Sequence, residues 1–275
     1  MEYTAAIRST ISMIESEYKR LASFFRTFDE ARWKQPTYCT DWDASQVVGH
    51  LTLGADFYAS TVRGGLEGNY GFPLGAKDKD DFMKIRTSRM DEYAALSGDQ
   101  LVDRFEKNTK GVLELFQGLT PEDYEKRAWH RRGVLPIRYF IIQRLNEFSL
   151  HEWDIRNDPG APVYSGSQEV ATENLRQRFP IIYNVSPASG LEGVFRFETT
   201  DTGQAWAIEI QNGEAVDCTG RNGEYDASFF TTASDFLLLV TGRGEIPDKE
   251  KSGDFRIEGG RTKADALIPS LFFPI

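Results

Sequence analysis

A proline-rich break at residues 156–162 divides this sequence into two halves with different hydrophobic patterns. The break reads Arg-Asn-Asp-Pro-Gly-Ala-Pro, and two prolines with a glycine inside seven residues are typical of a linker. Before the break, apolar residues recur every three or four positions, whereas after it some segments alternate with the period of a β-strand. We therefore predict two domains, at residues 1–157 and 163–275.

The first half predicts an all-α four-helix bundle. Over residues 5–28, Ile7, Ile11, Ile14 and Tyr18 begin one apolar stripe of a long amphipathic helix. Further helices are predicted from a cap at Asp43 or Ser45 to Val62 (ending before Gly64-Gly65), over 82–97, over 99–119, and from Pro136 to Ile155. Long helices with apolar stripes are typical of an antiparallel bundle.

The second half predicts a smaller α+β domain. Asn212-Gly213 is the strongest hairpin signal in it, since both residues tolerate the positive φ angles of a tight turn. The pattern predicts helices over 167–179, 233–241 and 262–271, and strands over 193–199, 206–210, 215–219, 225–231 and 255–258.

Charge and cysteine usage limit the partners and the compartment. The net charge is −10, from 32 basic and 42 acidic residues, which argues against binding to nucleic acid or to an anionic membrane. The apolar runs are too short to span a bilayer, and the first residues lack the pattern of a signal peptide. Cys39 and Cys218 are too far apart in sequence to suggest a disulfide framework, so we predict a cytoplasmic protein.

Two of the three histidines fall on inward helix faces and suggest a metal site. Glu147 and His151 are four residues apart, so on a helix they project from the same face. His50 lies on the apolar stripe of its own helix, beside Val47 and Leu51. Together the three side chains would form a His₂Glu set with an open fourth position, as in catalytic zinc sites, and the same set would suit non-haem iron.

Each of these residues also has an ordinary interpretation. Glu147 and His151 could simply hydrogen-bond to each other, and His50 could be a satisfied core histidine. We expect His130, in a loop of basic residues, to lie on the surface. Asp154 is our reserve ligand or a partner that orients His151, whereas Cys39 is a weak candidate for a nucleophile.

Two segments of the first half resemble the DinB-like family of mycothiol-dependent maleylpyruvate isomerase relatives. Residues 39–51, Cys-Thr-Asp-Trp-Asp-Ala-Ser-Gln-Val-Val-Gly-His-Leu, resemble its Cys-x-x-Trp-x-x-x-x-Val-x-x-His-Leu segment, and residues 147–154 resemble its Glu-x-x-x-His-x-Trp-Asp helix. Residues 233–243, which end in Gly-Arg, are similar to a helix of the sterol-carrier-like C-terminal domain of these proteins. The resemblance implies that His50, Glu147 and His151 hold a divalent metal, usually zinc.

We therefore predict a zinc-dependent thiol S-transferase or isomerase. The cosubstrates would be a small electrophile and a low-molecular-weight thiol, namely mycothiol, ergothioneine, bacillithiol or glutathione. Arg243 and Arg144 would pair with a carboxylate of the substrate or the thiol, because a guanidinium group matches a carboxylate. A metal-dependent hydrolase with Glu152 or Asp154 as general base, and a non-catalytic small-molecule-binding protein, are the alternatives. We expect a monomer or a small homo-oligomer.

Overall fold

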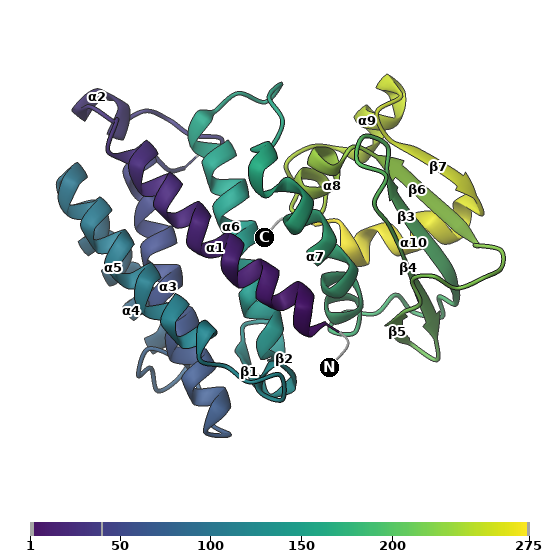
Figure 1. Ribbon diagram of the computed structural model, residues 1–275, viewed down its shortest axis with the longest axis horizontal. Helices are drawn as coiled ribbons and strands as arrows, with labels where there is room; N and C mark the ends of the chain where they lie inside the picture. The colour runs from purple at the N-terminus through teal and green to yellow at the C-terminus, as the bar shows by residue number, and fades with distance from the viewer. Residues whose placement is uncertain (1–2, 40, 274–275) are drawn as a thin grey trace. The chain divides into compact units, whose positions relative to one another are not determined.

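The chain divides into two compact units, Met1–Tyr164 and Ser165–Ile275. The computed structural model describes residues 3–39 and 41–273, so Thr40 of the Cys39–Leu51 segment and the predicted domain ends at residues 1 and 275 lie outside the described residues. The first unit is built mainly of helices and the second contains a sheet (Figure 1). The predicted fold class, a helical bundle followed by an α+β domain, is confirmed.

Four helices form the bundle of the first unit. Helix α1 packs against α5 and α6, and α3 packs against the same two helices, while α4 lies against α3 (Figure 1). The elements of this unit are α1 (Thr4–Phe25), α2 (Glu30–Trp33), α3 (Ala44–Leu66), α4 (Lys79–Ala94), α5 (Gly98–Gln117), the 3-10 turn η1 (Asp123–Glu125), β1 (Arg127–His130), β2 (Gly133–Pro136) and α6 (Ile137–Arg156).

Helix α6 is the central element of the bundle. Of its 20 residues, 17 are buried, including polar and charged ones, so it presents no wide solvated face. An aromatic row joins it to the neighbouring helices: the Phe148 ring lies 5.8 Å from Phe105 of α5, and Phe105 lies 5.5 Å from Phe25 of α1. Edge-to-face pairs of this kind add to the hydrophobic burial that holds the helices together.

The predicted end of α3 is wrong. The helix continues through Gly64-Gly65 to Leu66. The glycines do not end the helix; they allow close packing against it. A Cβ atom at Gly65 would lie 2.8 Å from the Cβ of Ala128, so only glycine lets the hairpin strand β1 approach α3 this closely.

The expected loop around His130 is also different in the structure. Residues 127–136 form an antiparallel hairpin in which His130 pairs with Gly133. The His130 ring is half-buried and lies 5.5 Å from Tyr139 and 6.0 Å from Phe140 of α6. His130 is therefore a packed hairpin residue and not a freely exposed surface histidine.

The second unit is a five-stranded sheet with helices packed on it. The strand order is β5-β4-β3-β6-β7, with β3 and β6 parallel and the other neighbours antiparallel. Asn212 and Gly213 both have positive φ angles, 54° and 79°, as the predicted hairpin turn requires. The elements are α7 (Ser165–Tyr183), β3 (Gly193–Thr199), β4 (Ala205–Gln211), β5 (Glu214–Asp217), β6 (Ala227–Thr231), α8 (Ala233–Leu239), α9 (Ile246–Ser252), β7 (Arg256–Gly259) and α10 (Arg261–Leu271).

Aromatic side chains form the core of this second unit. The ring of Phe197 on β3 stacks on Phe229 of β6 at 4.9 Å and on Trp206 of β4 at 5.6 Å. Phe179 of α7 covers Phe197 edge-on at 4.7 Å. Because successive side chains of a strand point to opposite faces, these rings lie on one face of the sheet, and that face is buried against a helix.

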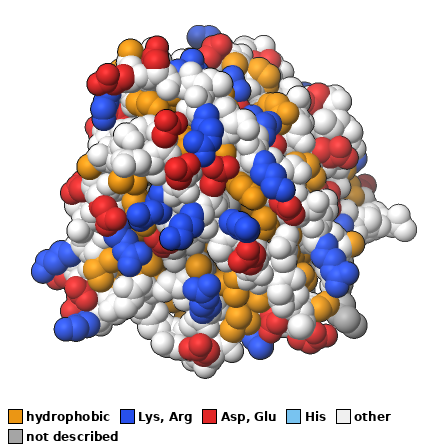
Figure 2. Space-filling model, turned by 60° about the vertical axis from the view of Figure 1, so that its left-hand side comes forward, with side chains coloured by type: hydrophobic (Ala, Val, Ile, Leu, Met, Phe, Trp, Pro, Cys, Tyr) orange, Lys and Arg blue, Asp and Glu red, His pale blue; other side chains and the backbone are white. Residues whose placement is uncertain are grey.

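The surface carries both signs of charge. Figure 2 shows basic side chains gathered over the middle of one face, with acidic and apolar side chains between and around them. Among the described residues, no helix is both long enough and apolar enough to cross a membrane.

The N-terminus of α3 is held by Asp43, and we expect Asp43→Ala to destabilise the helical unit. The Asp43 carboxylate accepts a hydrogen bond from the Gln46 backbone at 2.9 Å, while the Gln46 side chain accepts one from the Asp43 backbone. Loss of such a cap costs about 1 kcal/mol. Chemical denaturation should show the loss, whereas Asp43→Asn, which keeps an acceptor, should change stability much less.

The same carboxylate should make the stability of α3 depend on acid. Burial would raise the pKa of Asp43, but hydrogen bonds from Ser45 and Gln46 and the charge of Lys34 outweigh it and lower the pKa. The stabilisation is therefore present above the unfolded-state pKa and is lost as pH falls through the folded-state pKa. Equal acid sensitivity in wild type and Asp43→Asn would contradict this.

Candidate metal centre

The structure brings His50, Glu147 and His151 together inside the bundle. The His50 Nε2 atom lies 2.9 Å from Glu147 Oε2, and His151 Nε2 lies 3.3 Å from the same oxygen. The two imidazole rings are 4.8 Å apart between centroids. One donor atom from each residue lies within 4.8 Å of the other two, which is the spacing that a single metal ion needs.

Helix geometry and one helix contact produce this cluster. Glu147 and His151 are one turn apart on α6, so their side chains meet without any help from the tertiary fold. His50 comes from α3, which packs directly against α6. The cap at Asp43 begins α3 two turns before His50 and thereby fixes the position of the imidazole along the helix.

Burial and hydrogen bonds together set the charges of the cluster. Burial would raise the pKa of Glu147, but hydrogen bonds from His151 and His50 outweigh it and hold the pKa well below its usual value. Burial lowers the pKa of His50, with Glu147 opposing the effect. Glu147 is thus an anion and His50 favours the neutral form, and these are the forms in which both residues bind metals.

His151 is oriented by a second carboxylate. Its Nδ1 atom lies 2.8 Å from Asp154 Oδ2, and Asp154 is completely buried. Burial disfavours the imidazolium form, but hydrogen bonds with Asp154, Cys39 and Glu147 outweigh it and raise the pKa of His151 well above the usual value. A carboxylate on Nδ1 leaves Nε2 directed at the cluster, which is the arrangement common around histidine metal ligands.

Cys39, His151 and Asp154 form a second group with the spacing of a metal site. The Cys39 thiol donates to Asp154 Oδ2 at 3.2 Å. Both groups include His151, whose Nδ1 atom lies against Asp154 and whose Nε2 atom lies against Glu147. The first group is the better candidate for a metal site, because it contains two imidazole nitrogens and a carboxylate, the donors that zinc and iron share. Asp154 then has the orienting role.

The donor set fits a divalent metal with an open position. It contains two nitrogens and one oxygen, and the group includes no fourth His, Cys, Asp or Glu donor within the part of the chain that the structure describes. Three protein ligands are typical of catalytic zinc sites, whereas structural zinc sites are closed by four.

Arg144 lies deep in the bundle. It is fully buried, and its Nη1 and Nη2 atoms donate to the Leu51 carbonyl at 2.8 Å and to Thr109 Oγ1 at 2.9 Å. Its guanidinium also lies 4.3 Å from the Phe148 ring centroid. These contacts give Arg144 a role in joining α6 to α3 and α5, and the predicted contact with a substrate carboxylate stays a prediction.

Arg243 lies in the second unit, after α8. Its side chain is half-buried, and Nη1 donates to the Thr241 carbonyl at 2.9 Å. Its predicted role toward a carboxylate of the substrate or the thiol also stays a prediction.

Two residues next to the cluster were given no role in the sequence analysis. Gln143 donates from Nε2 to Glu147 Oε1 at 3.0 Å, and the Trp42 ring lies 5.2 Å from the His50 ring. Gln143 lies four residues before Glu147, so the same helical spacing that links Glu147 to His151 could have identified it. Trp42 gave no spacing signal, because it reaches His50 from the loop before α3.

Comparison with known proteins identifies a family for the helical unit. The family model of the mycothiol maleylpyruvate isomerase N-terminal domain matches residues 14–156, which is more than half of the chain. The chain belongs to this family. The mycothiol maleylpyruvate isomerase match contains all three residues of the cluster, and the alkyl sulfatase C-terminal family model matches residues 168–273. No curated protein sequence matches the chain.

Solved structures show the same fold over nearly the whole length. A mutant of the mycothiol-dependent maleylpyruvate isomerase matches with a TM-score of 0.60 at 12% identity, covering 93% of this chain and 94% of that chain. Another structure of that isomerase matches with a TM-score of 0.59 at 13% identity, covering 86% and 90%. The sterol carrier protein domain 2 of Helicoverpa armigera matches with a TM-score of 0.32 at 15% identity, covering 40% and 91%.

We expect the purified protein to contain about one divalent metal ion per chain, as a single three-ligand site implies. His50→Ala and His151→Ala should each remove most of it, because the coordination shell becomes incomplete. Elemental analysis by mass spectrometry measures the content. His130→Ala is the matched control, since it removes the remaining histidine without touching the cluster. Full occupancy in His151→Ala would refute the assignment.

Asp154→Asn should weaken metal binding without abolishing it. Loss of a carboxylate that orients a ligand typically costs about 10–100-fold in metal affinity. Competition with a chelator gives the affinity. Cys39→Ser separates the two groups: it should retain the metal if Cys39 only hydrogen-bonds to Asp154, and lose it if Cys39 is a ligand.

Proposed function

We propose that this chain is a metal-dependent enzyme that uses a low-molecular-weight thiol for S-transfer or for thiol-assisted cis–trans isomerisation of a small electrophile. The observation that carries the proposal is the cluster of His50, Glu147 and His151 in the bundle of a member of this family. The isomerase structures that share the fold are named mycothiol-dependent, which supports a thiol as cosubstrate. Zinc is the proposed metal.

The residues around the cluster would each do a definite task. When bound, the metal lowers the pKa of a thiol, and the thiolate supplies the nucleophile for S-transfer or isomerisation. Glu147 contributes a negative charge, held in place by Gln143 at 3.0 Å. Asp154 keeps the Nε2 atom of His151 turned toward the cluster. Trp42 covers His50 from one side and limits contact with water.

A hydrolase on the same ligands is less well supported. It needs a general base, and the nearby candidates are Glu152 and Asp154. Glu152 is 1% exposed and forms ion pairs with Arg20 and Arg156. Asp154 is completely buried and hydrogen-bonded to His151. Both carboxylates are already engaged, so neither offers a free oxygen for activating water.

A non-catalytic binding protein is the other alternative. A metal with a purely structural task should have four protein ligands, whereas this cluster offers three among the described residues. The open position favours chemistry on a small molecule over a structural role.

We expect a suitable thiol to raise the melting temperature of the metal-loaded protein. A ligand that binds only the native state at a hundredfold excess over its Kd stabilises by about 2.7 kcal/mol. The test is a thermal shift measurement with mycothiol, ergothioneine, glutathione and bacillithiol. The S-methylated form of the same thiol should shift the melt far less, because a thioether is neutral and coordinates zinc weakly.

Turnover provides the decisive check. Protein with metal and the stabilising thiol should isomerise or conjugate an electrophile such as maleylpyruvate, and His151→Ala should lose this activity. If none of the thiols shifts the melt, while an ester or amide is hydrolysed with the metal present, the hydrolase replaces this proposal.

A further inference from the structure

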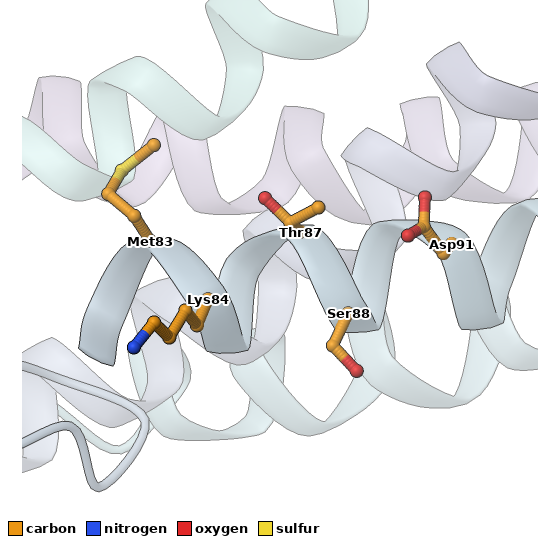
Figure 3. Close-up of a pocket in the computed structure, with 5 residues that line it drawn as sticks. All are labelled: Met83, Lys84, Thr87, Ser88 and Asp91. Atoms are coloured by element: carbon orange, nitrogen blue, oxygen red, sulfur yellow. The ribbon is translucent and has the colours of Figure 1, made fainter. Parts of the chain in front are cut away.

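Helix α4 turns two arginines toward the packed side of the helix. Its inner stripe runs through Phe82, Arg86, Arg89 and Tyr93, which are all half-buried or buried. The exposed side carries a different set of residues, which line a shallow pocket and are drawn as sticks in Figure 3: Met83, Lys84, Thr87, Ser88 and Asp91. Arg86 therefore belongs to the packed side of the helix.

The two arginines of the inner stripe differ in their partners. Arg89 Nη1 lies 3.3 Å from the Asp56 carboxylate, and Tyr93 donates to the same carboxylate at 2.5 Å. Arg86, one turn earlier, has no carboxylate within ion-pair distance in the described part of the chain. Its burial and the positive charge of Arg131 instead lower the pKa of Arg86, against a weaker opposing effect of Glu147. Arg86 is thus a half-buried cation without an ion-pair partner among the described residues.

The β1–β2 hairpin places Arg131 near this site. His130 pairs with Gly133, so Arg131 is the first residue of the two-residue turn. The Trp129 ring packs 5.2 Å from Phe82 of α4, and the His130 ring packs 6.0 Å from Phe140 of α6. The tip is thereby anchored to both helices. Arg131 is exposed, and no described carboxylate lies within 4 Å of its guanidinium.

An aromatic cluster adjoins the two arginines. The Trp129 ring lies 5.2 Å from Phe72, 5.2 Å from Phe82 and 6.1 Å from Phe57, and all four side chains are only half-buried. Phe82 is one helical turn from Arg86, and Trp129 is two residues from Arg131. Partly exposed aromatic surface therefore lies close in the chain to positive charge. Phe57 and His50 are seven residues apart on α3 and so share a face of that helix, which places this surface along α3 from the ligand cluster.

We propose that Arg86 and Arg131 form a carboxylate-binding pair beside the metal ligands, and that the cluster of Phe57, Phe72, Phe82 and Trp129 binds the flat aryl body of the same molecule. Guanidinium groups bind carboxylates through paired hydrogen bonds, and a bound anion would relieve the repulsion between the two cations. The inference rests on the proposed function, for which it defines the electrophile as an aryl-substituted carboxylate.

Calorimetric titration of the metal-loaded protein with cinnamate tests this without any thiol or turnover. Cinnamate should bind, while cinnamamide (the same shape without the charge) and acetate (the charge without the aryl body) should each bind at least about tenfold more weakly. Arg86→Gln and Arg131→Gln should each weaken cinnamate binding by about 10–100-fold, as expected for losing a hydrogen bond to a charged group. Lys84→Gln, on the exposed side of α4, is the matched control and should bind cinnamate normally.

Three results would overturn the proposal: equal affinity for cinnamate and cinnamamide, unchanged affinity in both arginine variants, or binding that disappears with the metal but not with the arginines. Metal content, measured in each variant, excludes an indirect effect on the cluster. If Arg86→Gln does not fold, Arg131→Gln decides the question, because Arg131 is exposed at a turn. Cinnamate binding by a protein without thiol-dependent activity would refute only the proposed function.

Discussion

Helix α6 buries ionisable side chains on successive turns, and each must find a partner because an unpaired buried charge costs several kcal/mol. The partners come from different elements. Arg144 donates to α3 and α5, Glu147 pairs with His50 of α3, and Glu152 pairs with Arg20 of α1. The packing of the bundle around α6 is therefore specified by polar contacts as well as by apolar burial. A shifted helix would leave a charge without its partner.

The same constraint explains why the ligand cluster is well defined. Glu147 accepts hydrogen bonds from two histidines and from Gln143, so its carboxylate has little freedom. Asp154 likewise fixes the ring of His151. A site in which the ligands are already aligned loses less conformational entropy when it binds its ligand.

Features that depend on local spacing could be predicted from the sequence. The pair of Glu147 and His151 follows from helix geometry, and the strand at residues 193–199 and the Asn212-Gly213 turn follow from backbone preferences. Features that depend on tertiary contact could not. In the sequence, Gly65 suggests the end of a helix. In the structure it lies within α3, because the close approach of strand β1 requires a glycine there. The turn at Arg131 lacks the usual turn residues, so the sequence pattern did not predict the β1–β2 hairpin. It also did not predict that this hairpin lies near α4.

The ligand cluster combines one local pair with one distant residue. His50 and Glu147 are 97 positions apart, so a metal held by both would act as a cross-link that closes a long loop of the chain. Closing such a loop in the unfolded chain is entropically costly, whereas the α6 pair can meet as soon as its helix forms. An ion could therefore first be captured by α6 alone and exchange easily. It would become firmly held only when α3 docks, so the rate at which the protein releases its metal would report how often these two helices separate.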